Sequence, residues 1–203
     1  MTAKILPDEI TPINSAELME TFARKYFQEF TGAPLTPGAI AIFTAQSALE
    51  TGRWKAIHCY NVGNIKANIT TYTNTICQFR CSEMIAHHEV WFDPPHPQCN
   101  FRAYYDLDAG VLDYLQLLAT KTRYALAWAA ALRGDPHVFV QALAKAGYFT
   151  ANAAAYERGV MSLHAKYLAE YLRTPHMVPP DHAEEAEWAR LRGLVIAAQF
   201  DIA

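Results

Sequence analysis

Long apolar runs and basic clusters are both missing from this sequence. No run of 18 or more apolar residues occurs, so the sequence predicts no membrane insertion. The net charge is −3, and no basic stripe is present that would neutralise phosphates, which excludes nucleic acid as a partner. Low-complexity tracts and internal repeats are absent too. With 203 residues, 52% of them hydrophobic, the chain is long enough for one well-buried domain and too short for two.

Cysteine is scarce and occurs only in a central segment, as Cys59, Cys77, Cys81 and Cys99. An even number of cysteines in one segment favours two disulfides that staple a small lobe. Four free, buried thiols are the second interpretation. Zinc is the third, because Cys77 and Cys81 have a spacing found in zinc knuckles and the same segment contains His58, His87, His88 and His96. No second closely spaced pair accompanies them, so we predict no metal site.

Apolar residues recur at three- and four-residue steps over most of the chain, which is typical of amphipathic helices. Residues suited to the N-cap position precede these stretches, and two of them are followed by proline at the first helical position. The N-cap residues are Asn14 or Ser15, Thr36, Asp106, Asp135 and Asn152. The pattern predicts helices over residues 15–30, 37–50, 107–118, 124–132, 136–147 and 153–171.

Residues 69–104 differ in composition, since they are rich in threonine, β-branched and aromatic residues that favour strands. We expect an α+β fold, mainly α, in which a helical body carries this small antiparallel β-lobe. The domain containing both parts spans residues 1–174, and prolines then precede a C-terminal helical extension over residues 175–203. Within the lobe, three short strands are predicted, at Thr70–Ile76, Met84–Phe92 and Cys99–Tyr104.

Glu50 lies where the second predicted helix ends, and Gly52 suits a helix end with positive φ. A carboxylate there faces apolar neighbours and the negative end of the helix dipole. Both effects raise the pKa of a carboxyl group, as a general acid working near neutral pH requires. The alternative is an ordinary solvated glutamate on the last helical turn.

Three spaced motifs, within roughly residues 15–170, together match the pattern of one known family. They are Ala48-Leu49-Glu50-Thr51-Gly52 followed by Tyr60-Asn61 and Ile65-Lys66-Ala67; Phe101-Arg102-Ala103-Tyr104 leading to Tyr114-Leu115; and Ala146-Gly147-Tyr148 leading to Tyr156. This pattern resembles the glucosaminidase family of peptidoglycan hydrolases (glycoside hydrolase family 73), which includes the wall-cutting domain of the flagellar rod-cap protein. The resemblance implies a lysozyme-like fold whose β-lobe flanks an active-site cleft.

The resemblance also implies catalytic roles. Glu50 becomes the general acid, and Tyr148 is expected to point into the cleft near the scissile sugar. The family's second glutamate lies on the hairpin about a dozen residues before the Phe-Arg-x-Tyr motif, which favours Glu89, with Glu83 in reserve. For Glu89 the alternative is a solvent-facing strand residue, and for Tyr148 it is a buried packing residue.

The Asn-containing turn lines the cleft in this family and helps to hold the N-acetyl sugar. The substrate-binding residues expected here are Trp54, Tyr60, Asn61, Lys66 and Tyr156. The chain departs from the family pattern at Asn64, which replaces the usual glycine, although asparagine tolerates left-handed φ. The usual Trp-Gly after Glu-Thr-Gly is also altered, to Arg53-Trp54-Lys55.

The function that these residues predict is peptidoglycan hydrolysis at a β-1,4 bond of the glycan strand, most directly as an endo-β-N-acetylglucosaminidase. Muramidase or lytic transglycosylase activity on the same fold is the nearest alternative. Two alternatives belong to other classes of protein: a catalytically inactive glycan-binding module and a zinc-binding module that acts in assembly. Glycoside hydrolysis by paired carboxylates needs no cofactor.

Peptidoglycan lies outside the cytoplasm, so we expect the protein to act in the periplasm or the cell wall. The segment 1–10 has no apolar stretch of the kind found in secretory signal peptides. We therefore expect delivery by a non-classical route, in a phage particle or through a secretion system. A delivery apparatus or an immunity protein would then be a partner.

Overall fold

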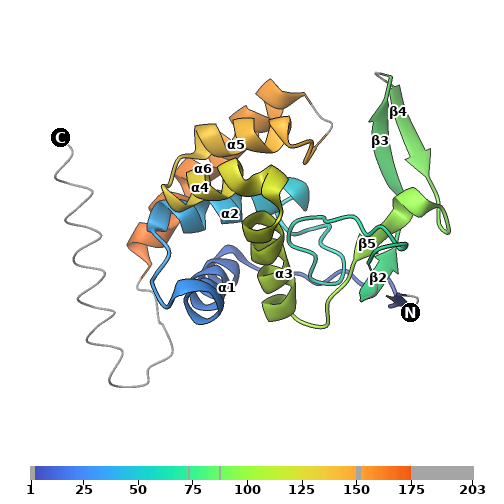
Figure 1. Ribbon diagram of the computed structural model, residues 1–203, viewed down its shortest axis with the longest axis horizontal. Coiled ribbons are helices and arrows are strands. Elements are labelled where there is room, and N and C mark those ends of the chain that lie inside the picture. Colours follow the sequence, from blue (N-terminus) through green and yellow to red (C-terminus); the bar gives the residue numbers. More distant parts are fainter. Residues whose placement is uncertain (1–2, 73, 87, 150–151, 175–203) are drawn as a thin grey trace.

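The computed structural model describes residues 3–72, 74–86, 88–149 and 152–174. The expected extension over residues 175–203 lies outside the described residues. Figure 1 shows the helices gathered on one side of the molecule and the strands on the other. In the part of the chain that is described, no helix is both long and apolar enough to cross a membrane.

The first two helices begin where their caps predict. Helix α1 spans Ser15–Tyr26 and continues as a π-helical turn, η1, over Phe27–Thr31. The side chain of Asn14 accepts a hydrogen bond from the backbone N–H of Glu17 at 2.9 Å. Helix α2 spans Pro37–Glu50, and the Thr36 hydroxyl accepts a hydrogen bond from the N–H of Ala39 at 3.1 Å.

Helix α2 lies at the centre of the helical body (Figure 1). Every residue from Pro37 to Ala48 is buried, and many of them are small, so neighbouring backbones approach closely. A Cβ added to Gly38 would lie 3.1 Å from the Cα of Gly134. Because its position is fixed on all sides, α2 presents its last residue, Glu50, at one place in the molecule.

Four further helices surround α2, and the predicted residues Asp106, Asp135 and Asn152 cap three of them. The four are α3, Leu107–Thr120; α4, Ala125–Leu132, preceded by a 3-10 turn, η3, at Thr122–Tyr124; α5, Pro136–Lys145; and α6, Ala153–Arg173. Helix α6 makes the most extensive packing with α2. Aromatic rings fill the space between the helices, and Phe43 of α2 contacts the rings of Phe22, Tyr114, Trp128 and Phe139.

The β-lobe consists of a three-stranded sheet and a hairpin. The sheet has the order β1–β2–β5, with β1 at Lys4–Ile5, β2 at Thr75–Gln78 and β5 at Asn100–Arg102. The hairpin joins β3, Cys81–Ile85, to β4, His88–Phe92, and a 3-10 turn, η2, follows at Pro97–Cys99. The fold class is thus as predicted: mainly α, with a small β-lobe beside the helices.

Three details of the lobe differ from the sequence prediction. The strand expected at Thr70–Ile76 begins only at Thr75, because the carbonyl of Asn68 accepts from the N–H groups of Thr71 and Tyr72 and so forms a turn. The run expected as one strand, Met84–Phe92, is divided by the hairpin turn, where Ala86 has a φ of 47°. Alanine gives no turn signal, so the turn is imposed by pairing of the flanking strands. The sheet is also not purely antiparallel, because β1 pairs in parallel with β2, from a segment that carried no strand signal.

Candidate active site

Glu50 is positioned by an abrupt turn at the end of α2. The N–H of Arg53 donates to the carbonyl of Ala48, and Gly52, Arg53 and Trp54 have φ values of 58°, 56° and 62°. The left-handed conformation at Gly52 is as predicted, and two non-glycine residues share it. The Thr51 hydroxyl stabilises this turn by accepting from the N–H of Trp54 at 3.1 Å. The chain therefore leaves the helix sharply, and the Glu50 side chain is not covered by a further helical turn.

The environment of Glu50 suits a proton donor. Burial raises the pKa of its carboxyl group from 4.5 to about 7, and a hydrogen bond from Tyr156 opposes part of this shift. The hydroxyl of Tyr156, a residue of helix α6, donates to Oε1 of Glu50 at 2.6 Å. The side chain remains partly accessible to solvent. A carboxyl group with this pKa is protonated in a substantial fraction of molecules at neutral pH.

Three phenols interact with this carboxyl group: those of Tyr114 and Tyr156, which are buried, and that of Tyr148, which is partly buried. For each of them, burial raises the pKa well above 10, and the negative charge of Glu50 raises it further. The phenols are therefore proton-bearing donors at any working pH. Tyr114 donates to the side-chain oxygen of Gln46, one turn before Glu50 on α2. The hydrogen bonding of Gln46 is thus internal to the core.

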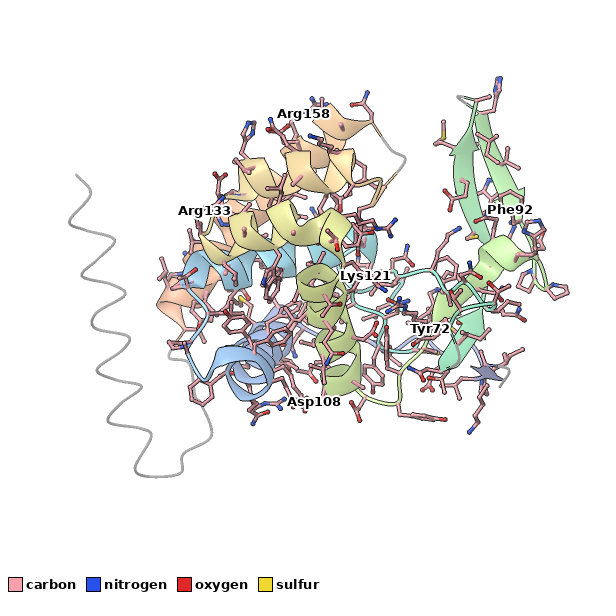
Figure 2. The ribbon with its side chains drawn as sticks, viewed as in Figure 1. Tyr72, Phe92, Asp108, Lys121, Arg133 and Arg158 are labelled. Carbon is pink, nitrogen blue, oxygen red and sulfur yellow. The ribbon has the colours of Figure 1, made fainter. Side chains whose placement is uncertain are left out.

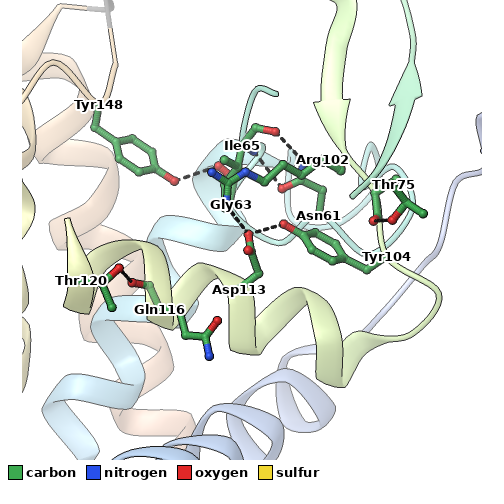
Figure 3. A network of polar contacts seen from close by, with 11 residues as sticks. Asn61, Gly63, Ile65, Thr75, Arg102, Tyr104, Asp113, Gln116, Thr120 and Tyr148 are labelled. Atoms are coloured by element: carbon green, nitrogen blue, oxygen red, sulfur yellow. Dashed lines mark hydrogen bonds and ion pairs between the residues drawn. The ribbon is translucent and has the colours of Figure 1, made fainter. Parts of the chain in front are cut away.

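Tyr148 and the Asn61 turn lie next to each other (Figure 3). The Tyr148 hydroxyl donates to the carbonyl of Gly63 at 2.9 Å. A Cβ on Gly63 would lie 3.0 Å from this hydroxyl and 2.7 Å from the Tyr114 ring, so only glycine fits. Asn64 adopts a φ of 49°, which preserves the turn in place of the family's usual glycine.

The Asn61 side chain is 3% exposed, and its polar atoms are used within the protein. Its amide group donates to the carbonyls of Ile65 and Arg102, both at 2.9 Å, and its oxygen accepts from the N–H of Ile65 at 2.8 Å. Both amide protons are therefore engaged. The side chain ties the loop that follows Glu50 to strand β5, rather than presenting free donors to a sugar.

A polar network joins this loop to helix α3 (Figure 3). Asp113 accepts from Arg102 Nη1 at 2.7 Å and from the Tyr104 hydroxyl at 2.5 Å. The Arg102 guanidinium also lies over the ring of Tyr72, 4.6 Å from its centroid; Tyr72 is labelled in Figure 2. Sequence reasoning missed Asp113. The polar members of the Phe-Arg-Ala-Tyr motif were the available signal, because a partly buried arginine needs a carboxylate partner.

The two candidates for a second carboxylate face opposite sides of the hairpin. Glu83 precedes Met84, and Met84 pairs directly with Glu89, so the two glutamates lie on different faces. Glu83 is partly buried and forms an ion pair with Lys66 of the loop after Glu50. Glu89 is exposed and accepts a hydrogen bond from the Ser82 hydroxyl at 2.8 Å.

Of the remaining expected substrate contacts, Trp54 lies in the core. It is 6% exposed, donates from Nε1 to the Ser47 hydroxyl at 3.0 Å and packs on the ring of Tyr167. Tyr60 is partly buried against the same core. Lys66 binds Glu83 and donates to the carbonyl of Gln98 at 3.0 Å. The structure thus brings Glu50, Tyr148 and Tyr156 together, and it gives the other side chains packing or bridging contacts.

The four cysteines are free thiols in the structure, and Cys59, Cys77 and Cys99 are buried. Among the residues that the structure describes, no three histidine, cysteine or acidic side chains are grouped so as to hold a metal ion.

A mainly helical body, a small β-lobe and a glutamic acid of raised pKa at the end of a buried helix define the lysozyme-like class of glycoside hydrolases. The family model described as "Glucosaminidase: Mannosyl-glycoprotein endo-beta-N-acetylglucosaminidase" matches residues 38–169. The match covers more than half of the chain, so the protein belongs to the glucosaminidase family. No curated protein sequence matches it.

Solved structures resemble this chain over most of their length. A peptidoglycan hydrolase mutant from Sphingomonas sp. A1 has 26% identity and a TM-score of 0.57, with 77% of this chain and 97% of that chain covered. A C-terminally truncated glycoside hydrolase domain of FlgJ from Salmonella typhimurium has 23% identity and a TM-score of 0.50, covering 76% and 96%. The catalytic domain of the autolysin Auto from Listeria monocytogenes has 18% identity and a TM-score of 0.52, covering 79% and 89%. The last two share the fold.

Proposed function

We propose that this glycoside hydrolase cleaves β-1,4 bonds in the glycan strand of peptidoglycan, on the reducing side of N-acetylglucosamine. The observation that carries the proposal is Glu50, a partly accessible carboxyl group whose pKa burial raises to about 7. The family match supports N-acetylglucosamine as the sugar whose bond is cut. The likeness to the peptidoglycan hydrolase from Sphingomonas sp. A1 supports peptidoglycan as the polymer that is cut.

Glu50 acts as the general acid in this proposal. Cleavage of a glycosidic bond needs a proton on the leaving oxygen as positive charge develops at the anomeric carbon. Because Tyr156 donates to Oε1, the acid proton is carried on Oε2, the oxygen left to protonate the leaving group. Burial keeps this proton in place up to about neutral pH. No metal is needed for this step.

We infer that Glu83, rather than Glu89, supplies the second carboxylate. Glu83 is on the hairpin face that contacts Lys66, and Lys66 belongs to the loop that leads away from Glu50. Glu89 is bound to Ser82 on the opposite face and is exposed. In this position Glu83 stabilises the oxocarbenium-like charge or activates water. Attack by the N-acetyl oxygen of the substrate itself is compatible with the first of these roles.

The test is digestion of purified peptidoglycan by the wild-type protein and by Glu50→Gln. Loss of turbidity is followed, the products are reduced with borohydride, and the new ends are identified by mass spectrometry. Reduced N-acetylglucosamine ends from the wild type alone support the proposal. Reduced muramic acid ends would keep Glu50 as the acid but make the enzyme a muramidase, and anhydromuramic ends would make it a lytic transglycosylase. Binding of peptidoglycan by both proteins, with no cleavage by either, would leave a glycan-binding module.

The polymer places the site of action in the periplasm or the cell wall. We further propose that a delivery apparatus carries the enzyme there, and that an immunity protein protects the cell that makes it. Expression with and without an added signal peptide tests this. We expect lysis only when the wild-type protein is directed to the periplasm, and no lysis with Glu50→Gln in either compartment. Lysis from cytoplasmic expression without a signal would show that the chain needs no separate apparatus.

A further inference from the structure

The four cysteines lie in two pairs. Cys59 and Cys77 lie together in one small buried cluster, and Cys81 lies beside the chain at Gln98 and Cys99. Burial raises the pKa of Cys77 and of Cys81, and in each pair the neighbouring thiol raises it further, that of Cys77 by Cys59 and that of Cys81 by Cys99. The two pairs enclose chain loops of equal length, Cys59 to Cys77 and Cys81 to Cys99. None of these contacts takes part in the chemistry proposed for Glu50.

The sheet explains why these particular cysteines meet. Cys77 of β2 pairs with Phe101 of β5, and Cys59 joins the same small core, because the N–H of Tyr104 donates to the Cys59 carbonyl at 3.0 Å. At the other end of these strands, the N–H of Phe79 donates to the Cys99 carbonyl at 3.4 Å. That hydrogen bond brings the segment after β2 next to the segment before β5, just before β3 begins.

The second pair meets at the base of the hairpin. The thiol of Cys81, the first residue of β3, lies 3.2 Å from the carbonyl of Gln98, the residue before Cys99. Cys99 is fully buried, whereas Cys81 is partly exposed. Within the described residues no third ligand is placed to complete a metal site with either pair. Two close thiols without a third ligand are suited to a disulfide.

We propose that the protein carries two disulfides: Cys59–Cys77, which clamps the β-lobe onto the loop that follows Glu50, and Cys81–Cys99, which closes the base of the hairpin within the lobe. The first would fix the chain immediately before Tyr60 and Asn61 to strand β2. The second would fix the start of β3, and with it Glu83, to the chain leading into β5. The clamp thereby holds the lobe carboxylate at a set position relative to the helical body. The inference goes beyond the proposed activity and does not depend on it.

Formation of each protein disulfide requires an oxidant that accepts two electrons. Oxidised glutathione is the oxidant in the test. The Cys81 thiolate attacks one sulfur of oxidised glutathione, which forms a mixed disulfide and releases one glutathione thiolate. Cys99 then loses its proton and attacks Sγ of Cys81, which forms the protein disulfide and releases the second glutathione thiolate. The two protons from the cysteines end on the two glutathione molecules. Cys59 and Cys77 react in the same way before the lobe closes over them, since both are buried in the folded protein.

The experiment is a disulfide map of the full chain, folded with oxidised and reduced glutathione and trapped with an alkylating reagent. Digestion without reduction, followed by mass spectrometry, should give peptides joined through Cys59–Cys77 and Cys81–Cys99. We expect the oxidised protein to melt roughly 5 to 10 °C above the reduced protein for each disulfide. The partly exposed Cys81–Cys99 disulfide should be reduced first when dithiothreitol is added.

Matched double variants test the pairing. Cys59→Ser with Cys77→Ser should keep one disulfide, and Cys81→Ser with Cys99→Ser should keep the other. The crossed variant, Cys59→Ser with Cys81→Ser, should keep none, although it also has two cysteines. Four alkylated thiols in the oxidised wild type, any other pairing in its map, or stoichiometric zinc in the purified protein would overturn the proposal. Because the map is read on the wild type without an activity assay, its failure is distinct from failure of the proposed function.

Discussion

Glu50 and Glu83 belong to two regions that hold a carboxylate by different means. In the helical body, Glu50 ends a helix of which residues 37–48 are all buried, inside one continuous apolar core. In the β-lobe, the described residues form a small buried cluster of Cys59, Cys77, Phe101 and Ala103, against which Leu6, Phe79 and Cys81 pack. The hairpin beyond it exposes Met84, Ile85 and Trp91. Figure 2 shows Phe92, on this hairpin, well away from the helices. The body therefore fixes its acid by packing, whereas the lobe depends on strand pairing, an ion pair and its cysteines.

The largest expected difference between the regions is catalytic. Replacing Glu50 with glutamine removes the acid proton and should lower kcat by roughly 10³-fold. The fold should be kept, because glutamine is nearly isosteric and the side chain is uncharged when Glu50 is protonated. Turbidity assays at pH 6 and thermal unfolding together check this. A variant that retains more than a tenth of the wild-type rate would contradict the role of Glu50.

The two regions should also differ in how much one aromatic side chain stabilises the fold. Phe43 is fully buried at the centre of the ring cluster, so Phe43→Ala should lower the free energy of unfolding by about 3 to 5 kcal/mol. Trp91 is 51% exposed, and Trp91→Ala should change it by about 0.5 kcal/mol or less. Chemical denaturation of both variants is the measurement. Equal losses would mean that the lobe is as tightly packed as the body.

The raised pKa of Glu50 predicts a dependence of stability on pH. Since the folded state holds the proton more tightly than the unfolded state, this stabilising contribution is fully present below pH 4.5 and is lost as pH rises to about 7. The loss should reach up to roughly 3 kcal/mol. Comparing unfolding of the wild type and Glu50→Gln from pH 4.5 to 8 isolates this group. Parallel curves for the two proteins would show that the pKa of Glu50 is ordinary.

The lobe glutamates give a sharper comparison, because they lie on one hairpin and differ in the face that they occupy. We expect Glu83→Gln to lower kcat by about 10²-fold through lost charge stabilisation, and Glu89→Gln to leave it within about twofold of the wild type. Both variants need equal melting temperatures for this comparison. The reverse order of effects would return the role to Glu89.

The smallest expected effect concerns the hydrogen bond to Glu50. The Tyr156 hydroxyl stabilises the ionised carboxylate, so Tyr156→Phe should raise the pKa of Glu50 further. The alkaline limb of the pH–kcat profile should move up by roughly half a pH unit. Tyr26→Phe, in the α1 core away from Glu50, is the control. A downward shift would mean that Tyr156 stabilises the protonated form instead.

The sequence predicted those parts of the molecule whose signals are local. Asn14, Thr36, Asp106 and Asp135 each cap the helix that follows, because a cap depends on a few adjacent residues. The position of Glu50 at the end of α2 was predicted in the same way, from the helix before it and the glycine after it. In both cases, residues within one or two helical turns of the position determine the local conformation.

The lobe was harder to predict, since its structure depends on residues far apart in sequence. The turn at Ala86 and the parallel pairing of β1 with β2 follow from strand partners rather than local preference. The contacts of Asn61 with Arg102 and of Tyr148 with Gly63 likewise join segments far apart in sequence. Which glutamate faces the loop after Glu50 depends on strand register, which a count of positions along the chain does not give.

The segment before α1 determines where the N-terminal boundary of an excised domain must lie. Lys4 and Ile5 cover the edge of β2, the carbonyl of Glu9 accepts from the N–H of Cys59 at 2.9 Å, and the N–H of Thr11 donates to Ile57 at 2.9 Å. The family match begins only at residue 38. A fragment trimmed to the matched span would lose α1, expose the edge of β2 and release the backbone of the loop after Glu50. The smallest autonomous unit therefore starts well ahead of the region recognisable by similarity, and excision, fusion or transplantation of the domain should begin no later than Lys4.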